Sequence, residues 1–413
     1  MPDRSEAVPV AAAPPGTGGA RWVLLFGIWL VYLSFGMITV SLAPVVAPIT
    51  RDLGLSHGAM GSVLGIWQLV YIAAAIPCGA LLDRLGARRA LFIGALIVAA
   101  SGLARSFATD YATLLLAVGL FGIGGPIVSS GAPKAVSQLF TGSQRGLAMG
   151  IYITGPAMGS VIVLSLTNAV AMPALGHDWH RVLQLWSLCA FAGAGVWLLL
   201  SLHPVARRLD NPADSGPRPR QTEVIGSLLK LPAVRMLLLM AVGIFSFNHG
   251  LNNWLPELLR HDGMTAAAAG YWATIPTVVA IVGSLLIPRL ATPERRFVLL
   301  AGLGLAAMFA SLMLEAGGGP VLLVGLMLQG IARSSLMTVA ILTLVETRGV
   351  GEKYAGTASG LFFSAAEIGG AGGPIMLGVL YDATGGFDAG LFMLAGIGAL
   401  LAVAALRLRK VSA

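Results

Sequence analysis

Twelve long apolar stretches, separated by short polar segments, dominate the sequence. Each stretch has roughly 20 residues, the length that an α-helix needs to cross the hydrocarbon core of a bilayer. A helix also pairs its own backbone polar groups, as lipid requires. The expected spanning helices are residues 23–46, 59–82, 89–106, 112–133, 146–171, 183–203, 233–255, 266–288, 297–315, 320–343, 355–381 and 388–407. The pattern therefore predicts an all-α membrane protein with twelve transmembrane helices.

The longest polar stretch between two apolar runs separates the first six expected helices from the last six. It reads PVARRLDNPADSGPRPRQTEVIGSLLK and begins at Pro204. We expect an N-terminal six-helix bundle over residues 23–203, a cytoplasmic linker over 204–232 and a C-terminal six-helix bundle over 233–407. The Ala/Pro/Gly-rich residues 1–22 are expected to be disordered, and residues 408–413 to be a short C-terminal tail.

The two halves repeat each other. RGLAMGIYITGPAMGS at 145–160 aligns with AGTASGLFFSAAEIGG at 355–370 at a constant offset of 210 residues. Three glycines of the first segment, Gly146, Gly150 and Gly159, meet Gly356, Gly360 and Gly369 of the second. Membrane transporters built from two parallel repeats place their substrate site near the midplane, between the halves. We therefore expect two pseudo-symmetric bundles around such a site.

Composition and charge agree with a membrane protein. Of the 413 residues 56% are hydrophobic and only 11% are charged, against about 25% charged residues in soluble domains. With the N-terminus in the cytoplasm, 20 of the 26 Lys and Arg residues fall on the cytoplasmic side. This bias is the positive-inside pattern, so the net charge of +8 does not indicate nucleic-acid binding. We expect a bacterial-type inner membrane protein with both termini in the cytoplasm.

The turn after the second apolar run combines glycines with charged residues. It reads GALLDRLGARR from Gly79 to Arg89. Asp83 can pair with cations or cap a neighbouring helix N-terminus, and Gly86 permits a tight turn. Gly79 is expected to allow close packing of a neighbouring helix.

This turn resembles the signature loop of the major facilitator superfamily, although Ala87 stands where that family usually has a basic residue. Together with the twelve runs and the repeat, the resemblance covers about residues 23–407 and implies transport by two rocking bundles. It implies a cytoplasmic gate that contacts the second half when the cavity faces outward. The expected gating residues are Gly79, Asp83, Arg84, Gly86, Arg88 and Arg145.

The fourth apolar run indicates which branches of the superfamily the chain resembles. It lacks the arginine that drug-efflux branches usually carry in its first half, which reads LLLAVGLFGIGGPIV. The stretch from Ala132 through Lys134 to Phe140 is more similar to the cyanate and nitroimidazole transporters and to small-anion branches. Lys134 either snorkels to the interface or is a second cation on the substrate path.

Two charges lie deep in the second half. A charge at the bilayer centre costs about 2.5–3.5 kcal/mol on insertion scales, so each is a candidate functional residue. Arg333 lies about 20 Å into the tenth run at 1.5 Å per residue, and a guanidinium binds carboxylate-like groups bidentately. We interpret it as the ligand of an anionic substrate. Glu367, at similar depth in the eleventh run, is the candidate proton-coupling residue. The alternative is a permanent Arg333–Glu367 ion pair.

Further polar side chains are expected to face the site. The seventh run contains Asn248, His249 and Asn252, although His249 could equally be a neutral histidine bonded to a neighbouring helix. In the first half the candidates are Tyr32, Gln68, Tyr71 and Tyr152, each of which could instead serve packing.

No catalytic constellation or phosphate-binding GxxxxGK[ST] motif occurs in the sequence. We therefore predict a transporter without enzymatic activity, cofactor or metal, and a monomer. The predicted function is secondary active transport of a small organic or inorganic anion, coupled to protons or to a counter-anion. The alternatives are proton-coupled efflux of lipophilic or cationic drugs, and a non-transporting membrane sensor on a transporter fold.

Overall fold

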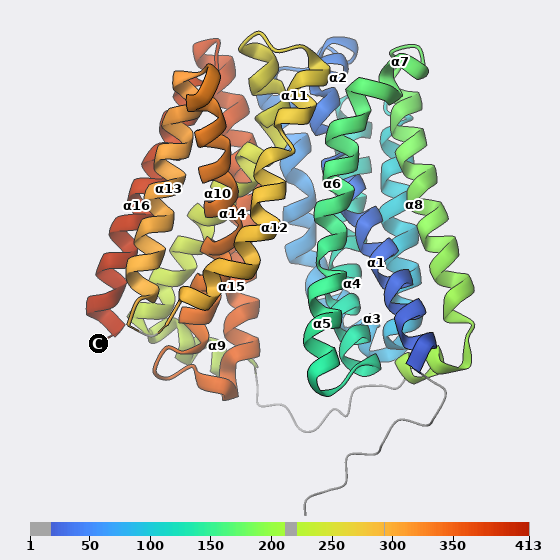
Figure 1. The fold of residues 1–413 in the computed structure, drawn as a ribbon, viewed down its shortest axis with the longest axis vertical. Helices are drawn as coiled ribbons and strands as arrows, with labels where there is room; N and C mark the ends of the chain where they lie inside the picture. The colour runs from blue at the N-terminus through green and yellow to red at the C-terminus, as the bar shows by residue number, and fades with distance from the viewer. Residues whose placement is uncertain (1–17, 211–220, 293, 413) are drawn as a thin grey trace, which may run out of the picture.

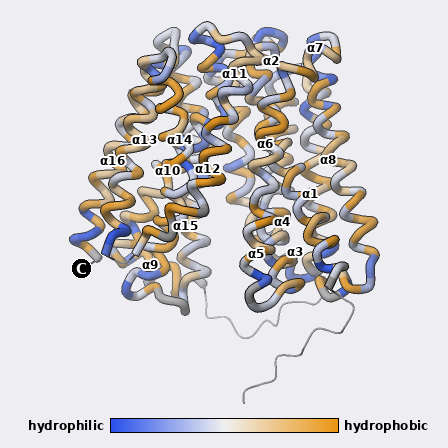
Figure 2. Tube along the Cα trace, in the orientation of Figure 1, coloured by the Kyte–Doolittle hydropathy of each residue, from blue (hydrophilic) through white to orange (hydrophobic). Residues whose placement is uncertain are grey.

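The computed structural model describes residues 18–210, 221–292 and 294–412, and within these ranges the secondary structure is helical throughout (Figure 1). Most of the N-terminal segment expected to be disordered, and residues 211–220 of the expected linker, lie outside the described residues. Hydrophobic residues cover the middle of the helices, whereas hydrophilic residues gather at the two ends of the molecule (Figure 2). This distribution matches a protein that spans a bilayer.

The first half consists of helices that end in short polar turns. Its elements are α1 (Gly18–Val40), η1 (Ala43–Val45), α2 (Val46–Asp52), α3 (His57–Arg105), α4 (Tyr111–Leu139), α5 (Gly142–Tyr152), α6 (Thr154–Leu166), η2 (Thr167–Ala171), α7 (Met172–Ala174) and α8 (Trp179–Ser201). Side chains cap several starts: Ser56 accepts the backbone N–H of Ala59, and Asp110 forms a capping box with Thr113 before α4. Such caps satisfy N–H groups that a helix leaves unpaired.

The second half follows the polar segment between the bundles. That segment contains η3 (Pro204–Asp210) and α9 (Gln221–Lys230), and the second half consists of α10 (Pro232–His261), α11 (Ala266–Trp272), α12 (Ile275–Leu286), η4 (Ile287–Leu290), α13 (Arg296–Ala316), α14 (Gly319–Val345), α15 (Gly351–Thr384) and α16 (Asp388–Ser412). The expected linker thus contains two short helices in its described part. The last helix continues through residues 408–412, which the sequence assigned to a tail.

Eleven helical segments of the described chain are long and apolar enough to cross a membrane. The longest, α3, has 49 residues, about 74 Å at 1.5 Å per residue, more than twice the hydrocarbon thickness. Its helical geometry breaks at Gly86, where φ is 75° and ψ is 163°. Residues on both sides of this break, Leu82 and Leu91, approach Gly131 of α4. The segment therefore doubles back and supplies two crossings, which accounts for all twelve runs of the sequence.

The repeat is visible in how the halves pack. In α6, a Cβ on Gly155 would lie 2.9 Å from the carbonyl oxygen of Trp29, and Gly159 faces Leu33 of α1 in the same way. In α15, the equivalent Gly369 faces the backbone of α10 at Val242. Small residues permit this close approach of helices. The glycines shared by the repeats therefore fix the same helix pair in each bundle.

The two halves meet at one end and separate at the other. We call the end carrying η3 and α9 the linker end, and the end carrying α2, α7 and α11 the far end (Figure 1). Towards the far end, Gly61 and Gly65 of α3 pack against the backbone of α15 at Pro374 and Ala371. Gly270 of α11 likewise packs on the carbonyl of Leu164 in α6.

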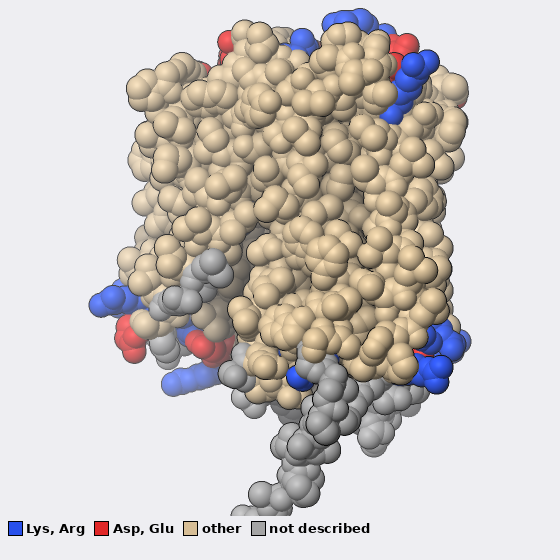
Figure 3. All heavy atoms as spheres, turned by 45° about the vertical axis from the view of Figure 1, so that its right-hand side comes forward, with Lys and Arg blue, Asp and Glu red and all other residues tan. Residues whose placement is uncertain are grey.

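Five glycines in the linker-end half of the helices have no such neighbours. A Cβ at Gly79, Gly146, Gly150, Gly356 or Gly360 would meet no atom within 4 Å apart from its own helix. The space-filling view is hollowed between the halves toward this end (Figure 3). The structure is thus closed at the far end and open at the linker end.

Candidate functional site

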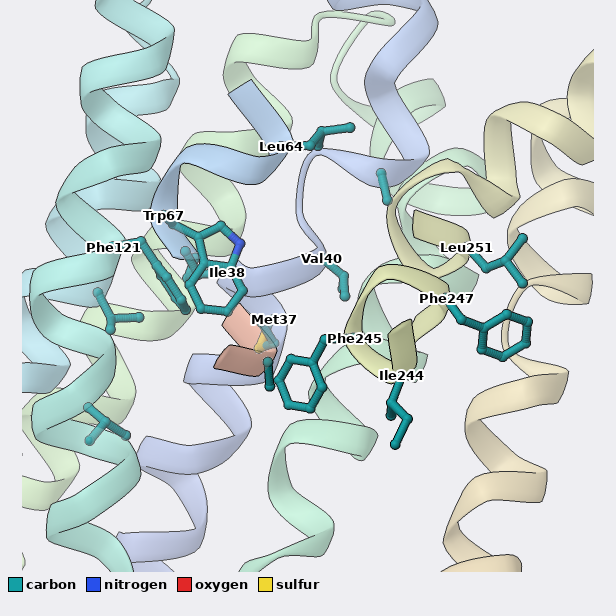
Figure 4. Close-up of a cluster of buried hydrophobic side chains, with 14 of the residues drawn as sticks. Met37, Ile38, Val40, Leu64, Trp67, Phe121, Ile244, Phe245, Phe247 and Leu251 are labelled. Carbon is teal, nitrogen blue, oxygen red and sulfur yellow. The ribbon is translucent and has the colours of Figure 1, made fainter. Parts of the chain in front are cut away.

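The charged and polar residues singled out from the sequence lie in the middle of four long helices. Arg333 is in α14, Glu367 in α15, His249 in α10 and Gln68 in α3. Buried hydrophobic side chains from α1, α3, α4 and α10 surround this level of the molecule (Figure 4). Rings link the halves here, because Trp67 of α3 and Phe245 of α10 both contact the His249 imidazole, at centroid distances of 5.7 and 5.4 Å.

Arg333 has few partners within the protein. Its Nη1 donates one hydrogen bond to Oγ1 of Thr277 in α12, at 3.2 Å. Among the described residues it forms no ion pair, and its side chain is only partly buried. A guanidinium has five N–H donors, so most of its hydrogen-bonding capacity remains available. The permanent ion pair with Glu367 considered from the sequence is not formed in this conformation.

Glu367 is almost completely enclosed, with 6% of its surface exposed. Its Oε2 is buried and has no hydrogen-bond donor among the described residues. A Cβ placed on Gly370, one turn further along α15, would lie 3.0 Å from this oxygen. A buried acceptor without a donor is unfavourable, and more so when the group is charged.

Gln68 joins the first half to the second. Its Nε2 donates to the carbonyl oxygen of Gly370 at 3.2 Å and lies 3.3 Å from Nδ1 of His249. Its Oε1, like Oε2 of Glu367, is buried and unpaired. The sequence indicated Gln68 only as one of several polar residues at the right depth. Its position between α10 and α15 depends on how the bundles dock, which the sequence does not reveal.

The tyrosines form a polar aromatic group in the first half. Tyr32 of α1 and Tyr152 of α5 have ring centroids 5.2 Å apart. The hydroxyl of Tyr71 in α3 is hydrogen-bonded to Ser129 of α4 at 2.8 Å. These hydroxyls add hydrogen-bonding groups to the central region of the first half.

The asparagines of α10 differ from one another. Oδ1 of Asn248 is buried without a donor, whereas Asn252 is half-buried and has no side-chain hydrogen bond among the described residues. Asn253 is bonded within its own helix, because its Nδ2 donates to the backbone carbonyl of His249, one turn earlier. Of these polar side chains of α10, His249 is the one that contacts Trp67 and Gln68 of the first half.

The expected gate is held within the first half in this conformation. Nζ of Lys134 lies 2.8 Å from Oδ1 of Asp83, so in this conformation its charge is paired with the carboxylate of the expected gate. Arg88 binds Asp210 of η3 through two hydrogen bonds, at 3.0 and 2.5 Å. The predicted close packing at Gly79 is absent, because the halves are apart at this end.

The remaining gate residues fit the same picture. Arg84 and Arg145 are exposed and form no ion pair among the described residues. Gly86 adopts the positive φ expected for its turn, and a Cβ there would lie 2.5 Å from Cα of Asp210. Both constraints explain a glycine at this position.

Two interactions at the far end were missed by the sequence analysis. Arg105 is 1% exposed and donates to the carbonyl oxygen of Ile38 at 2.7 Å. Asp382, at the end of α15, accepts the backbone N–H groups of His57 and Gly58 at 2.9 and 2.7 Å. These two N–H groups begin α3, so a carboxylate of one half caps a helix of the other. In the sequence, the only indication of either interaction was a charged residue at the end of an apolar run.

Within the described residues, no three His, Cys, Asp or Glu side chains form a group that could hold a metal ion. The site is therefore built from one partly exposed cation, one buried carboxyl group and neutral hydrogen-bonding groups. This composition can bind a small anion and exchange a proton.

The chain matches known transporters over most of its length. The family model described as Major Facilitator Superfamily matches residues 24–374, and a second match covers 250–413. A D-galactonate transporter of Escherichia coli is 27% identical over 301 residues, 68% of each protein. A quinolone resistance transporter of Acinetobacter baumannii is 26% identical over 373 residues, 83% of each protein. An inward-facing, unoccupied crystal structure of a bacterial homologue of the human lysosomal transporter Spinster gives a TM-score of 0.70 at 18% identity, covering 96% of both chains.

Proposed function

We propose that this chain, which belongs to the Major Facilitator Superfamily, is a secondary active transporter of a small organic acid anion. Transport proceeds by alternating access, with the two bundles rocking around the central site. The observation that carries the proposal is Arg333, a cation in the middle of α14 with one hydrogen bond and no acidic partner among the described residues.

An arginine at this depth needs an anionic partner. Placing its charge at the bilayer centre costs about 2.5–3.5 kcal/mol on insertion scales. Neutral Thr277 compensates little of that cost through a single hydrogen bond of 3.2 Å. A carboxylate can take two parallel hydrogen bonds from a guanidinium, which adds both energy and orientation. A bound organic acid therefore completes the site better than any group that the protein supplies in this conformation.

The surroundings favour an acid that also carries hydroxyl groups. Thr277, the Tyr71–Ser129 pair and the Tyr32–Tyr152 pair provide hydroxyls at the same level of the molecule. Hydroxyl groups both donate and accept hydrogen bonds, so they suit a polyhydroxy acid better than a bare inorganic ion. The similarity to a protein named D-galactonate transporter supports the same substrate class.

The driving force is an ion gradient or exchange against a second anion. Glu367 is the residue that can carry the coupling proton, because its buried carboxyl group approaches Gly370, the residue of α15 that Gln68 of the first half contacts. The linker end, with Arg88, Arg145 and Arg407, is the cytoplasmic side under the positive-inside rule. The conformation open at that end is then the inward-facing one.

Uptake by purified protein in liposomes tests this function. We expect counterflow of a labelled sugar acid or hydroxy acid, and stabilisation of the folded protein by the same ligand in a thermal-shift screen. Arg333→Ala should lose both signals at least tenfold, the factor that corresponds to about 1.4 kcal/mol of lost anion binding. Arg333→Lys should retain part of the binding, because it keeps the charge without the planar fork.

The matched control is Arg407→Ala, which removes an exposed arginine at the end of α16. It should leave transport and ligand stabilisation unchanged. Normal transport of acids by Arg333→Ala, with the protein folded, would overturn the assignment of the anion site.

A second candidate is efflux of lipophilic or cationic drugs. The similarity to a quinolone resistance transporter favours it, as do a buried carboxyl group and the aromatic rings around His249. Drug-stimulated thermal stabilisation that depends on Glu367 and not on Arg333 would favour this candidate. A protein that binds ligand without any counterflow would instead point to a sensor.

A further inference from the structure

We propose that a proton held between Glu367 of α15 and Gln68 of α3 ties the two halves together, so that protonation favours the conformation closed at the far end. This inference rests on the proposed transport function and adds to it the partner of the coupling group and the effect of the proton. It explains two unpaired atoms that have no other account within the described residues.

The two unpaired atoms are both hydrogen-bond acceptors. Oε2 of Glu367 and Oε1 of Gln68 are buried, and neither has a donor among the described residues. Gln68 is fully buried and Glu367 is 6% exposed. A proton converts one carboxylate oxygen from an acceptor to a donor. A single proton on Glu367 therefore satisfies both orphan atoms at once, through an O–H group donating to the Gln68 amide oxygen.

The side chains converge on one residue of the second half. A Cβ at Gly370 would lie 3.0 Å from Oε2 of Glu367, 3.1 Å from Cγ of Gln68 and 3.4 Å from Cδ2 of His249. Glycine is thus the residue that leaves room for Gln68 to reach α15. The hydrogen bond from Nε2 of Gln68 to the Gly370 carbonyl oxygen holds the amide at this same residue of α15.

The orientation of the Gln68 amide follows from its neighbours. Exchanging its oxygen and nitrogen would place an oxygen 3.2 Å from the carbonyl oxygen of Gly370, where two acceptors would repel each other. With Nε2 facing Gly370 and His249, the amide oxygen is the atom left without a donor. We assign its donor to Glu367, whose Oε2 approaches the same residue, Gly370, and which gains a donor on protonation.

The other titratable groups around Glu367 do not take this role. On α10, Nδ1 of His249 accepts from Gln68 in this arrangement, and a doubly protonated imidazole could not accept. On α3, Tyr71 is already hydrogen-bonded to Ser129, and on α14, Arg333 is a permanent cation. The charged residues of α9 and α16 lie close to the ends of those helices. The proton is therefore assigned to Glu367.

The contact exists only while the far end is closed. Gln68 belongs to the first half, and its reach to α15 depends on the close seam where Gly61 and Gly65 meet Pro374 and Ala371. Separation of α3 from α15 would remove Gln68 from Glu367 and expose the carboxyl group to water. The ionised form is favoured there, so proton release and opening of the far end accompany each other.

The test measures conformation without substrate, as a function of pH. Cys78 and Cys189 are the free cysteines of the described chain and are replaced by serine. Spin labels are then attached at Arg181→Cys and Ala266→Cys, exposed positions of the two halves at the far end. Pulsed electron paramagnetic resonance measures the distance between the labels in lipid nanodiscs, and the distance distribution gives the closed-to-open ratio. In the otherwise unchanged protein this ratio should fall about tenfold as the pH rises, the effect of losing one strong hydrogen bond.

Three variants separate the proton bridge from a general effect of pH. Glu367→Gln keeps a neutral amide that can donate to Gln68, so it should remain closed at every pH. Gln68→Leu removes the acceptor and should flatten the pH response. Glu315→Gln, which neutralises an exposed carboxylate at the end of α13, should respond as the parent does. Infrared difference spectra should contain a protonated carboxyl band that disappears in Glu367→Gln and shifts in Gln68→Leu.

Several outcomes overturn the bridge. These are a ratio that does not change with pH, a full pH response in Glu367→Gln, or a carboxyl band that is unaffected by Gln68→Leu. Because no substrate is present, failure of the anion site at Arg333 leaves these measurements intact. Conversely, anion binding that depends on Arg333 with no pH response at Glu367 supports transport and refutes only the bridge.

Discussion

The carboxylate of Asp382 is expected to hold the far end closed, and its replacement should shift the conformational equilibrium by a calculable amount. The group accepts the backbone N–H groups of His57 and Gly58 at 2.9 and 2.7 Å. It lies at the N-terminus of α3, where the helix dipole favours negative charge. The capped helix belongs to the first half and Asp382 to the second, so the bonds must break when the far end opens.

The magnitude follows from what Asp382→Asn removes. The amide oxygen can still accept one of the two N–H groups, but the charge and one acceptor are lost. A hydrogen bond to a charged group contributes about 1.5–3 kcal/mol and a neutral one about 0.5–1.5 kcal/mol. The side chain is 35% exposed, which weakens its electrostatic contribution. We therefore expect a loss of about 1–2 kcal/mol, a change of roughly 5- to 30-fold in the closed-to-open ratio.

The labels at positions 181 and 266 measure this ratio directly. The control is Asp388→Asn, which removes an exposed carboxylate at the start of α16. Asp388 makes no hydrogen bond to the first half among the described residues, so its loss should leave the distance distribution unchanged. An equal shift in both variants would refute the cap and leave only an effect of surface charge.

Two stability predictions concern packing and a buried cation. Gly159→Leu should lower the thermal unfolding midpoint, because a side chain there would overlap the backbone of α1 and overpacking costs about 1–3 kcal/mol. Gly302→Leu in α13 should have a much smaller effect, because a Cβ at this position would have no atom of a neighbouring helix within 4 Å. Arg105→Met should cost about 1–3 kcal/mol, because the carbonyl of Ile38 loses its charged donor and keeps only the bonds from Ser41. Chemical denaturation in detergent would detect this, and an unchanged midpoint would show that water replaces the arginine.

The architecture was accessible from the sequence because the bilayer imposes it. A run of apolar residues long enough to span predicts a helix almost without regard to tertiary context. The turn at Gly86 and the repeated glycines Gly159 and Gly369 were also predicted, since each expresses a local steric requirement. The breaks within two runs were missed. Pro156 and Pro276 fall close to the starts of α6 and α12, where a missing N–H is tolerated.

The pairing of charges could not be predicted in the same way. Lys134 and Asp83 are 51 residues apart, and Arg88 and Asp210 are 122 apart. Each pair depends on the rotation of two helices about their axes, which an almost uniformly apolar sequence does not reveal. The depth of Arg333 and Glu367 in the membrane was predictable from counting residues. Their lack of mutual contact was not, because it depends on which way each side chain points.

In the proposed alternating access, these contacts make α3 the element that transmits the conformational change. Its first arm begins at the N–H groups capped by Asp382, carries Gln68 at mid-depth and ends near Asp83 at the linker end. A helix is stiff over this length, so movement of α3 against α15 must break the cap and separate Gln68 from Glu367 together. The same movement brings the linker-end turn toward the second half. Asp83 can then leave Lys134 for a partner in the second half. In this proposal, closure of the far end and closure of the linker end are therefore alternatives.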